Sequence, residues 1–271
     1  MIFSSPAKIN LSLKIIRKRS DGFHDIDSDF QFLNWGDKIE ISSSNKLSVS
    51  TTKIQLSQQE NLVTQALKKI ESFCDTKLNY SVKIEKNIPL GSGLGGGSSN
   101  AATVMLAVNS LAKLNLSLDV LVDLGKSLGS DIPFFLKGLS GRVSGIGEII
   151  EPKEFPENLV MILFPECSIS TKDAYNAVTL EEISNKKDRL NGNFFEEWVL
   201  FNYPQVREAF DFLSENKEVN ISGTGSSMFI KINSFEEGKE IMDNAPRKLA
   251  YVITNTINKS PLLNELLNSG V

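Results

Sequence analysis

Alternating hydrophobic and polar positions predict strands in the first third of the chain. Between residues 9 and 15, Ile and Leu alternate with polar neighbours, the period of two expected when one face of a strand is buried. A turn signal follows at 20–22, and similar alternation over 30–41 and 80–84 predicts further strands. The polar segment 42–57 is expected to be an irregular edge or hairpin.

Apolar residues at helical spacing are clearest in two segments. Over 61–73 they recur three and four positions apart, which predicts an amphipathic helix. The segment 98–114 is apolar almost all round, so we expect a helix buried at the centre of the fold. Further elements are expected as follows: helices over 117–128, 171–178, 204–214, 235–244 and from 261, strands over 159–164 and 250–254, and a hairpin over 219–232.

These strands and helices follow one another without a regular βαβ repeat. An α+β fold class with mixed or antiparallel sheets is therefore predicted. A strongly apolar strand begins soon after Pro152 and Pro156, which indicates a boundary there. We expect two domains, over 1–154 and 155–271.

Composition narrows the range of partners. Of the 271 residues, 41% are hydrophobic and 23% are charged, and the net charge is −4, so no global basic surface favours nucleic acid. No apolar run is long enough to cross a membrane, and the N-terminus has no signal or transit character. Cys74 and Cys167 have neither metal-ligand spacing nor a disulfide pattern. A soluble, cytoplasmic protein is expected, as a monomer or weak homodimer.

The segment from Pro89 to Asn100 carries the strongest chemical signal. Five glycines lie within 91–97, so backbone N–H groups can turn toward an anion. Ser98 or Ser99 is expected to cap the apolar helix that follows, whose N-terminal end favours negative charge. The pattern predicts a phosphate-binding loop.

Three other patterns resemble this loop. A dinucleotide fingerprint would need an acidic residue about twenty positions later at the end of a second strand, where a helix is expected here. A Walker loop would need a lysine at the position of Gly97. A flexible linker would not normally run straight into an apolar helix.

The loop resembles the second motif of the GHMP kinase superfamily, although Gly-Gly-Gly-Ser-Ser replaces the Gly-Ser-Ser-Ala of many members. Residues 5–11 and 222–227 resemble the first and third motifs, in the expected order. The resemblance implies a two-domain GHMP kinase fold and ATP as phosphoryl donor. It also implies Mg²⁺ carried by the nucleotide, with no metal ligand evident in the chain beyond a contact to Ser98 or Ser99.

Within the superfamily, the combination of residues 6–11, 19–24, 30–32, 91–101 and 129–135 is most similar to one branch. That branch phosphorylates the 2-hydroxyl of a cytidyl diphosphate sugar alcohol, 4-diphosphocytidyl-2-C-methyl-D-erythritol, in the non-mevalonate isoprenoid route. Two alternatives stay open: a GHMP kinase acting on homoserine or a mevalonate derivative, and a non-catalytic ATP-binding sensor.

The resemblance assigns catalytic roles to Asp131 and Lys8. From residue type alone, Asp131 would be an ordinary aspartate of a helix-terminal turn, and Lys8 a solvent-facing lysine of a strand. By resemblance, Asp131 matches the base that orients or deprotonates the attacking hydroxyl, and Lys8 stabilises its charge. Asn10 lies on the same strand face as Lys8 and is expected to hydrogen-bond the acceptor.

The remaining candidates divide between acceptor and nucleotide. By resemblance, His24, the single histidine, reads the cytosine, and Phe23 and Tyr175 stack on it. Acceptor contacts are also expected from Thr171, Gly223, Thr224 and Gly225. Contacts with ATP are expected from Asn61, Lys86, Pro89, Gly91, Gly93, Leu94, Gly95, Gly96, Gly97, Ser98 and Ser99.

Overall fold

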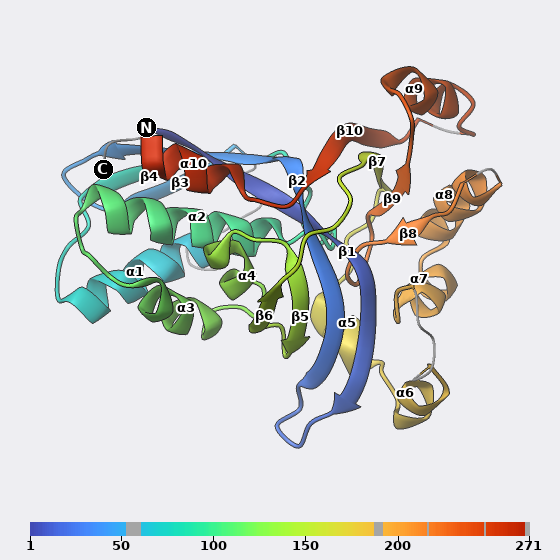
Figure 1. The fold of residues 1–271 in the computed structure, drawn as a ribbon, viewed down its shortest axis with the longest axis horizontal. Coiled ribbons are helices and arrows are strands. Elements are labelled where there is room, and N and C mark those ends of the chain that lie inside the picture. Colours follow the sequence, from blue (N-terminus) through green and yellow to red (C-terminus); the bar gives the residue numbers. More distant parts are fainter. Residues whose placement is uncertain (53–60, 187–191, 216, 247, 269–271) are drawn as a thin grey trace.

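Two long antiparallel strands, β1 and β2, run through the middle of the molecule (Figure 1). The computed structural model describes residues 1–52, 61–186, 192–215, 217–246 and 248–268. β2 is the hub of the sheet, because it pairs with β1, β4, β5 and β10. The main path of the sheet runs β3-β4-β2-β10-β7-β9-β8, and only the β3–β4 pair on it is parallel. The strands are β1 Ile2–Lys18, β2 His24–Ser43, β3 Ser48–Thr51, β4 Tyr80–Glu85, β5 Gly141–Gly145, β6 Ile149–Pro152, β7 Leu159–Phe164, β8 Asn220–Ile221, β9 Met228–Lys231 and β10 Ala250–Ile257.

Helices lie on both sides of this strand pair. In Figure 1, α1 to α4 gather on one side and α6 to α9 on the other. The helices are α1 Leu62–Cys74, α2 Gly96–Leu111, α3 Leu118–Lys126, α4 Ile132–Lys137, α5 Thr171–Asn176, α6 Leu180–Lys186, α7 Glu196–Asn202, α8 Pro204–Ser214, α9 Phe235–Asp243 and α10 Pro261–Asn268. None of the helices among these described ranges is long and apolar enough to cross a bilayer.

α2 is the central helix of the first half, as its apolar sequence predicts. Every residue from Ser99 to Met105 is buried, and α2 packs against α1, α4 and β1. Its start differs from the prediction. Gly95, in the left-handed region with φ 72°, is the N-cap, and no side chain caps the helix. The expectation of a cap at Ser98 or Ser99 is therefore wrong, because the glycine-rich backbone begins the helix with its N-cap at Gly95, three residues before Ser98.

The α+β class is confirmed, and most predicted elements lie where expected. Within the segment 42–57, residues 48–51 form β3, while 53–60 lie outside the described residues. β10 joins the two halves of the chain, since it pairs with β2 and with β7. α10 returns to pack on β1 and α2. The division into domains at 154/155 stays a prediction.

Candidate active site

A cavity of about 830 Å³ gathers most of the predicted site residues. It lies where β1, β2 and the start of α2 meet α5 and the turn between β8 and β9. Segments from both halves of the chain therefore line one site. Of the predicted residues, its lining includes Lys8, Asn10, Phe23, His24, Lys86, Pro89, Gly91, Gly93, Leu94, Gly95, Gly96, Gly97, Ser98, Asp131, Thr171, Tyr175, Gly223 and Thr224.

Lys8 and Asp131 form an ion pair in this cavity, with 3.6 Å between Nζ and Oδ2. Lys8 lies on β1 between two shifts of its register with β2, and Asp131 directly precedes α4. Lys8 Nζ also donates to Asn10 Oδ1 at 2.6 Å and to the Gly93 carbonyl at 3.2 Å. The predicted neighbourhood of these residues is thus present in the structure.

The electrostatics of Lys8 follow from its burial. Only 3% of the residue is exposed, and its ammonium lies 4.5 Å from the centre of the Phe30 ring. Burial lowers the pKa of Lys8, and the negative charge of Asp131 opposes that shift. A poorly hydrated cation beside a carboxylate can stabilise negative charge that develops on a reacting oxygen.

The start of α2 supplies backbone donors to the same cavity. The first intrahelical bond runs from the Ser99 N–H to the Gly95 carbonyl at 2.9 Å. The N–H groups of Gly96, Gly97 and Ser98 therefore have no partner within the helix. Such N–H groups at a helix N-terminus, together with the helix dipole, can bind an anion, and here they lie on the cavity wall.

Glycine is required where the loop approaches other backbone closely. Gly93 has φ 76°, and a Cβ there would lie 2.1 Å from the Ser222 carbonyl oxygen. The Lys8 N–H also donates to the Leu94 carbonyl at 3.1 Å, which holds the loop on β1. The loop is therefore held against both β1 and the third glycine motif.

Aromatic side chains form another part of the cavity wall. Phe23 lies in the β1–β2 turn and is 57% exposed, while His24 is buried. Tyr175 of α5 contacts His24, with 5.4 Å between ring centroids. Burial lowers the pKa of His24, and the nearby charge of Lys18 adds to the shift, so the ring is neutral at pH 7. His24 Nε2 is buried without a hydrogen-bond partner in the described part of the chain, as expected of a group that meets a polar ligand.

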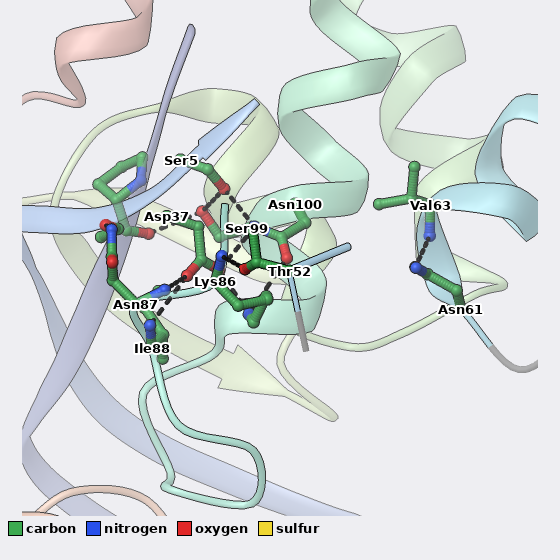
Figure 2. A network of polar contacts seen from close by, with 12 residues as sticks. Ser5, Asp37, Thr52, Asn61, Val63, Lys86, Asn87, Ile88, Ser99 and Asn100 are labelled. Atoms are coloured by element: carbon green, nitrogen blue, oxygen red, sulfur yellow. Dashed lines mark hydrogen bonds and ion pairs between the residues drawn. The ribbon is translucent and has the colours of Figure 1, made fainter. Parts of the chain in front are cut away.

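Three predicted site residues do not line the cavity. The Oδ1 of Asn61 accepts the Val63 N–H at 2.9 Å as the N-cap of α1 (Figure 2). The Ser99 hydroxyl donates to the Pro6 carbonyl at 2.7 Å and is buried. A Cβ on Gly225 would lie 3.1 Å from Ile169, away from the cavity lining. The cavity lining therefore does not support the ligand contacts expected for these three residues.

Sequence reasoning missed the apolar part of the lining. Leu13, Ile26, Phe30 and Ile146 line the cavity. Alternation along β1 and β2 does mark the first three as inward-facing. It cannot distinguish a side chain that faces the core from one that faces a cavity, because both are apolar.

Comparisons with known proteins agree with this geometry. The model of the GHMP kinases N terminal domain matches residues 61–139, which include the glycine loop, α2 and Asp131. A 4-diphosphocytidyl-2-C-methyl-D-erythritol kinase of Colwellia psychrerythraea is 34% identical over 96% of this chain and 91% of its own length. One from Acinetobacter baylyi is 36% identical over 96% of each chain.

The chain belongs to the 4-diphosphocytidyl-2-C-methyl-D-erythritol kinase family. A crystal structure of 4-(cytidine 5'-diphospho)-2C-methyl-D-erythritol kinase aligns with a TM-score of 0.79 at 25% identity, over 94% of this chain and 99% of that one. A mevalonate kinase structure aligns at 0.70 with 14% identity, over 96% of this chain and all of that one, which shows the shared fold. The protein is therefore a small-molecule kinase of the GHMP superfamily, and that membership implies ATP as the donor.

Proposed function

We propose that this kinase transfers the γ-phosphoryl group of ATP to the 2-hydroxyl of 4-diphosphocytidyl-2-C-methyl-D-erythritol. The observation that carries the proposal is one cavity with three functional parts. It contains the free N–H end of α2, the Lys8–Asp131 pair, and the group of Phe23, His24 and Tyr175. Membership of the family, whose named relatives act on this acceptor, supports the same assignment.

Each part serves one need of phosphoryl transfer. The N–H groups of Gly96, Gly97 and Ser98 bind phosphate oxygens. Asp131 orients the acceptor hydroxyl and takes its proton, while Lys8 neutralises charge that builds up during transfer. Loop, lysine and aspartate lie on separate elements that meet in the core, so the reacting groups are positioned before substrate binds.

The residues present fit a Mg²⁺ ion that arrives with the triphosphate. No group of three or more acidic, His or Cys side chains forms a metal site within the described ranges. Mg²⁺ commonly takes one or two protein oxygens, with phosphates and water completing its shell. The Ser98 hydroxyl lines the cavity and would supply one such oxygen, whereas the Ser99 hydroxyl is bonded to Pro6. The ion would neutralise charge on the phosphates.

The assignment is tested by acceptor specificity. Purified protein is incubated with ATP and Mg²⁺, and ADP formation is measured with 4-diphosphocytidyl-2-C-methyl-D-erythritol, homoserine, mevalonate or methylerythritol phosphate as acceptor. Only the cytidyl compound should give efficient turnover. Equal turnover with methylerythritol phosphate would contradict base recognition, and ATP binding without turnover on any acceptor would favour a sensor.

Enlarging Gly97 tests the phosphate site without disturbing the fold. Gly97 is exposed, and a Cβ there meets only Leu62 at 3.5 Å, an ordinary contact. Gly95 and Gly96 are poorer choices, because a Cβ would lie 2.8 Å from Phe135 or 2.9 Å from Ile88. Gly97→Val should raise KM for ATP about tenfold or more, since the side chain intrudes where phosphate meets backbone.

Thermal unfolding without ligand provides the control for Gly97. The midpoint should be unchanged in Gly97→Val and slightly higher in Gly97→Ala, because alanine favours the helix. KM for the cytidyl acceptor should stay native. Native ATP affinity in the valine variant would place the phosphates elsewhere.

Phe23→Ala tests the aromatic part of the cavity. Stacking of a base on an aromatic ring contributes roughly 1–3 kcal/mol, so KM for the cytidyl acceptor should rise severalfold or more while KM for ATP stays native. Tyr175→Ala should act in the same direction. Phe73→Ala is the matched control, because Phe73 is 55% exposed on α1, against 57% for Phe23. An acceptor KM equal in both phenylalanine variants would contradict stacking.

A further inference from the structure

A buried carboxylate beneath the glycine loop is fully occupied by hydrogen bonds. Asp37 lies on β2, and its side chain has no exposed area. Its Oδ1 accepts the backbone N–H groups of Asn87 at 2.7 Å and Ile88 at 2.8 Å. Its Oδ2 accepts Lys86 Nζ at 2.5 Å and Asn100 Nδ2 at 2.8 Å (Figure 2). Four donors thus use the whole acceptor capacity of one carboxylate.

These contacts join the two ends of the glycine loop. Residues 86–88 lead into the loop, and Asn100 lies in the second turn of α2, just beyond it. Asp37 holds both ends at once, although neither Asp37 nor Asn100 lines the cavity. One side chain therefore bridges the entry and the exit of the loop.

Lys86 is fixed by the same group. Its side chain is 2% exposed, and its Nζ donates to Asp37 and, at 3.2 Å, to Asn100 Oδ1. An ammonium has three donors, and Lys86 also lines the cavity, so the third can face a ligand. A Cβ on Gly96 would lie 3.2 Å from this Nζ, which places the charge beside the first residue of α2.

The network continues from α2 to the strand that carries Lys8. Asn100 Nδ2 also donates to Ser5 Oγ at 2.8 Å, and Ser5 Oγ lies 2.9 Å from Ser99 Oγ. The Ser99 hydroxyl in turn donates to the Pro6 carbonyl. Asp37 is thereby connected to β1 at Ser5 and Pro6, just before Lys8 in the same strand. Figure 2 shows Asp37, Asn100, Ser5 and Ser99 of this network.

A buried ion pair contributes little net stability compared with apolar packing of the same volume, because both charges lose their hydration. What such a group provides is a defined geometry. We propose that Asp37 is a positioning residue for the nucleotide: through Lys86, the loop entry and Asn100, it fixes the backbone donors and the cation that meet the triphosphate. The inference rests on the proposed ATP site and deepens it.

The test is the effect of Asp37→Asn on ATP alone, measured in the full-length chain. Affinity for ATP is measured by calorimetry without acceptor, and KM is measured for both substrates at a temperature where circular dichroism shows the variant folded. An amide nitrogen would face Lys86 Nζ and Asn100 Nδ2, so the loop support loses its acceptor. ATP binding should weaken about tenfold or more, since small misplacements are costly, and KM for the acceptor should stay native.

Two controls separate positioning from general destabilisation. Gln31→Leu alters another buried polar residue of β2, whose amide donates to the Pro156 carbonyl rather than to the loop; it should leave ATP affinity native. Should Asp37→Asn fail to fold, Asn100→Ala carries the test. It keeps the Asp37–Lys86 pair and the Ser5–Ser99 bond and removes the bonds that Asp37, Lys86 and Ser5 make to Asn100. The same selective loss for ATP is expected.

Each result decides the matter. Native ATP affinity in a folded Asp37→Asn or Asn100→Ala protein overturns the positioning role. So does an equal rise in both KM values, or a loss of ATP affinity in Gln31→Leu of the same size. If the native protein itself does not bind ATP, the proposed function falls and the positioning role with it, a result seen before any variant is made.

Discussion

Asp131→Asn is expected to lower kcat at least about a hundredfold, the scale of losing a positioned base. Asparagine keeps the shape of the side chain and removes the charge that we propose accepts the proton of the acceptor hydroxyl. The fold should tolerate the change, because the Asp131 side chain is 27% exposed and makes no capping bond to α4. ATP affinity should hardly change, since the proposed phosphate site is formed by the start of α2 and the glycine loop. Steady-state kinetics and ATP calorimetry on the purified variant measure both effects.

A matched control is available on the neighbouring helix. Asp123 is an exposed aspartate of α3 that does not line the cavity. Asp123→Asn removes the same charge from the same kind of side chain and should leave kcat native. A kcat for Asp131→Asn within a few fold of the native value would show that Asp131 has been misassigned. Equal losses in ATP affinity and turnover would instead indicate a role in binding the nucleotide.

The predictable part of the fold is the part in which local pattern and final environment agree. Alternation along residues 9–15 predicts one buried strand face, and Ile9, Leu13 and Ile15 of β1 are buried. Asn10, on the opposite face, is buried as well. The apolar sequence of α2 can only be satisfied in a core, where it lies. Lys8 and Asn10 were placed on one face by strand period alone, and a 2.6 Å hydrogen bond joins them. The proximity of these two residues to Asp131 depends on tertiary contacts, and only the family resemblance predicts it.

The features that the sequence did not predict are those determined by backbone conformation or by residues distant in sequence. The predicted start of α2 is wrong because serine normally caps helices, whereas here Gly95 is the N-cap and no side chain caps the helix. Ser99 then falls on the inner side of the helix and bonds to Pro6. Asp37 follows Gly36 and reads as a turn residue of a strand edge, yet its four partners come from segments 49 to 63 residues away. No local pattern marks a contact of that kind.

Replacing Lys8 with methionine is expected to reduce kcat by a factor on the order of 10²–10³, the cost of removing one group that stabilises transition-state charge. Methionine keeps much of the apolar stem of the side chain and removes the ammonium that lies over the Phe30 ring. Two opposing effects act on the stability of the variant. Burial lowers the pKa of Lys8 in the folded state, so a charged Lys8 opposes folding at neutral pH, and methionine removes that cost. Methionine also removes the ammonium that bonds to Asn10 and Gly93 and pairs with Asp131, so kcat is measured at a temperature where circular dichroism shows the variant folded.

The pH profile gives the same assignment an independent readout. In the proposed mechanism the active form of Lys8 is protonated, and the protonated fraction falls as pH rises through the pKa of Lys8. Since that pKa lies below the ordinary lysine value of 10.5, kcat of the native enzyme should fall on the alkaline side sooner than an exposed lysine would allow. Lys38→Met, at an exposed lysine of β2 outside the cavity, should keep both the native kcat and this alkaline fall. In Lys8→Met the residual kcat should show no such fall on the alkaline side. A residual rate that retains the native alkaline fall would assign the titration to another group, and native kcat in Lys8→Met would remove Lys8 from the mechanism.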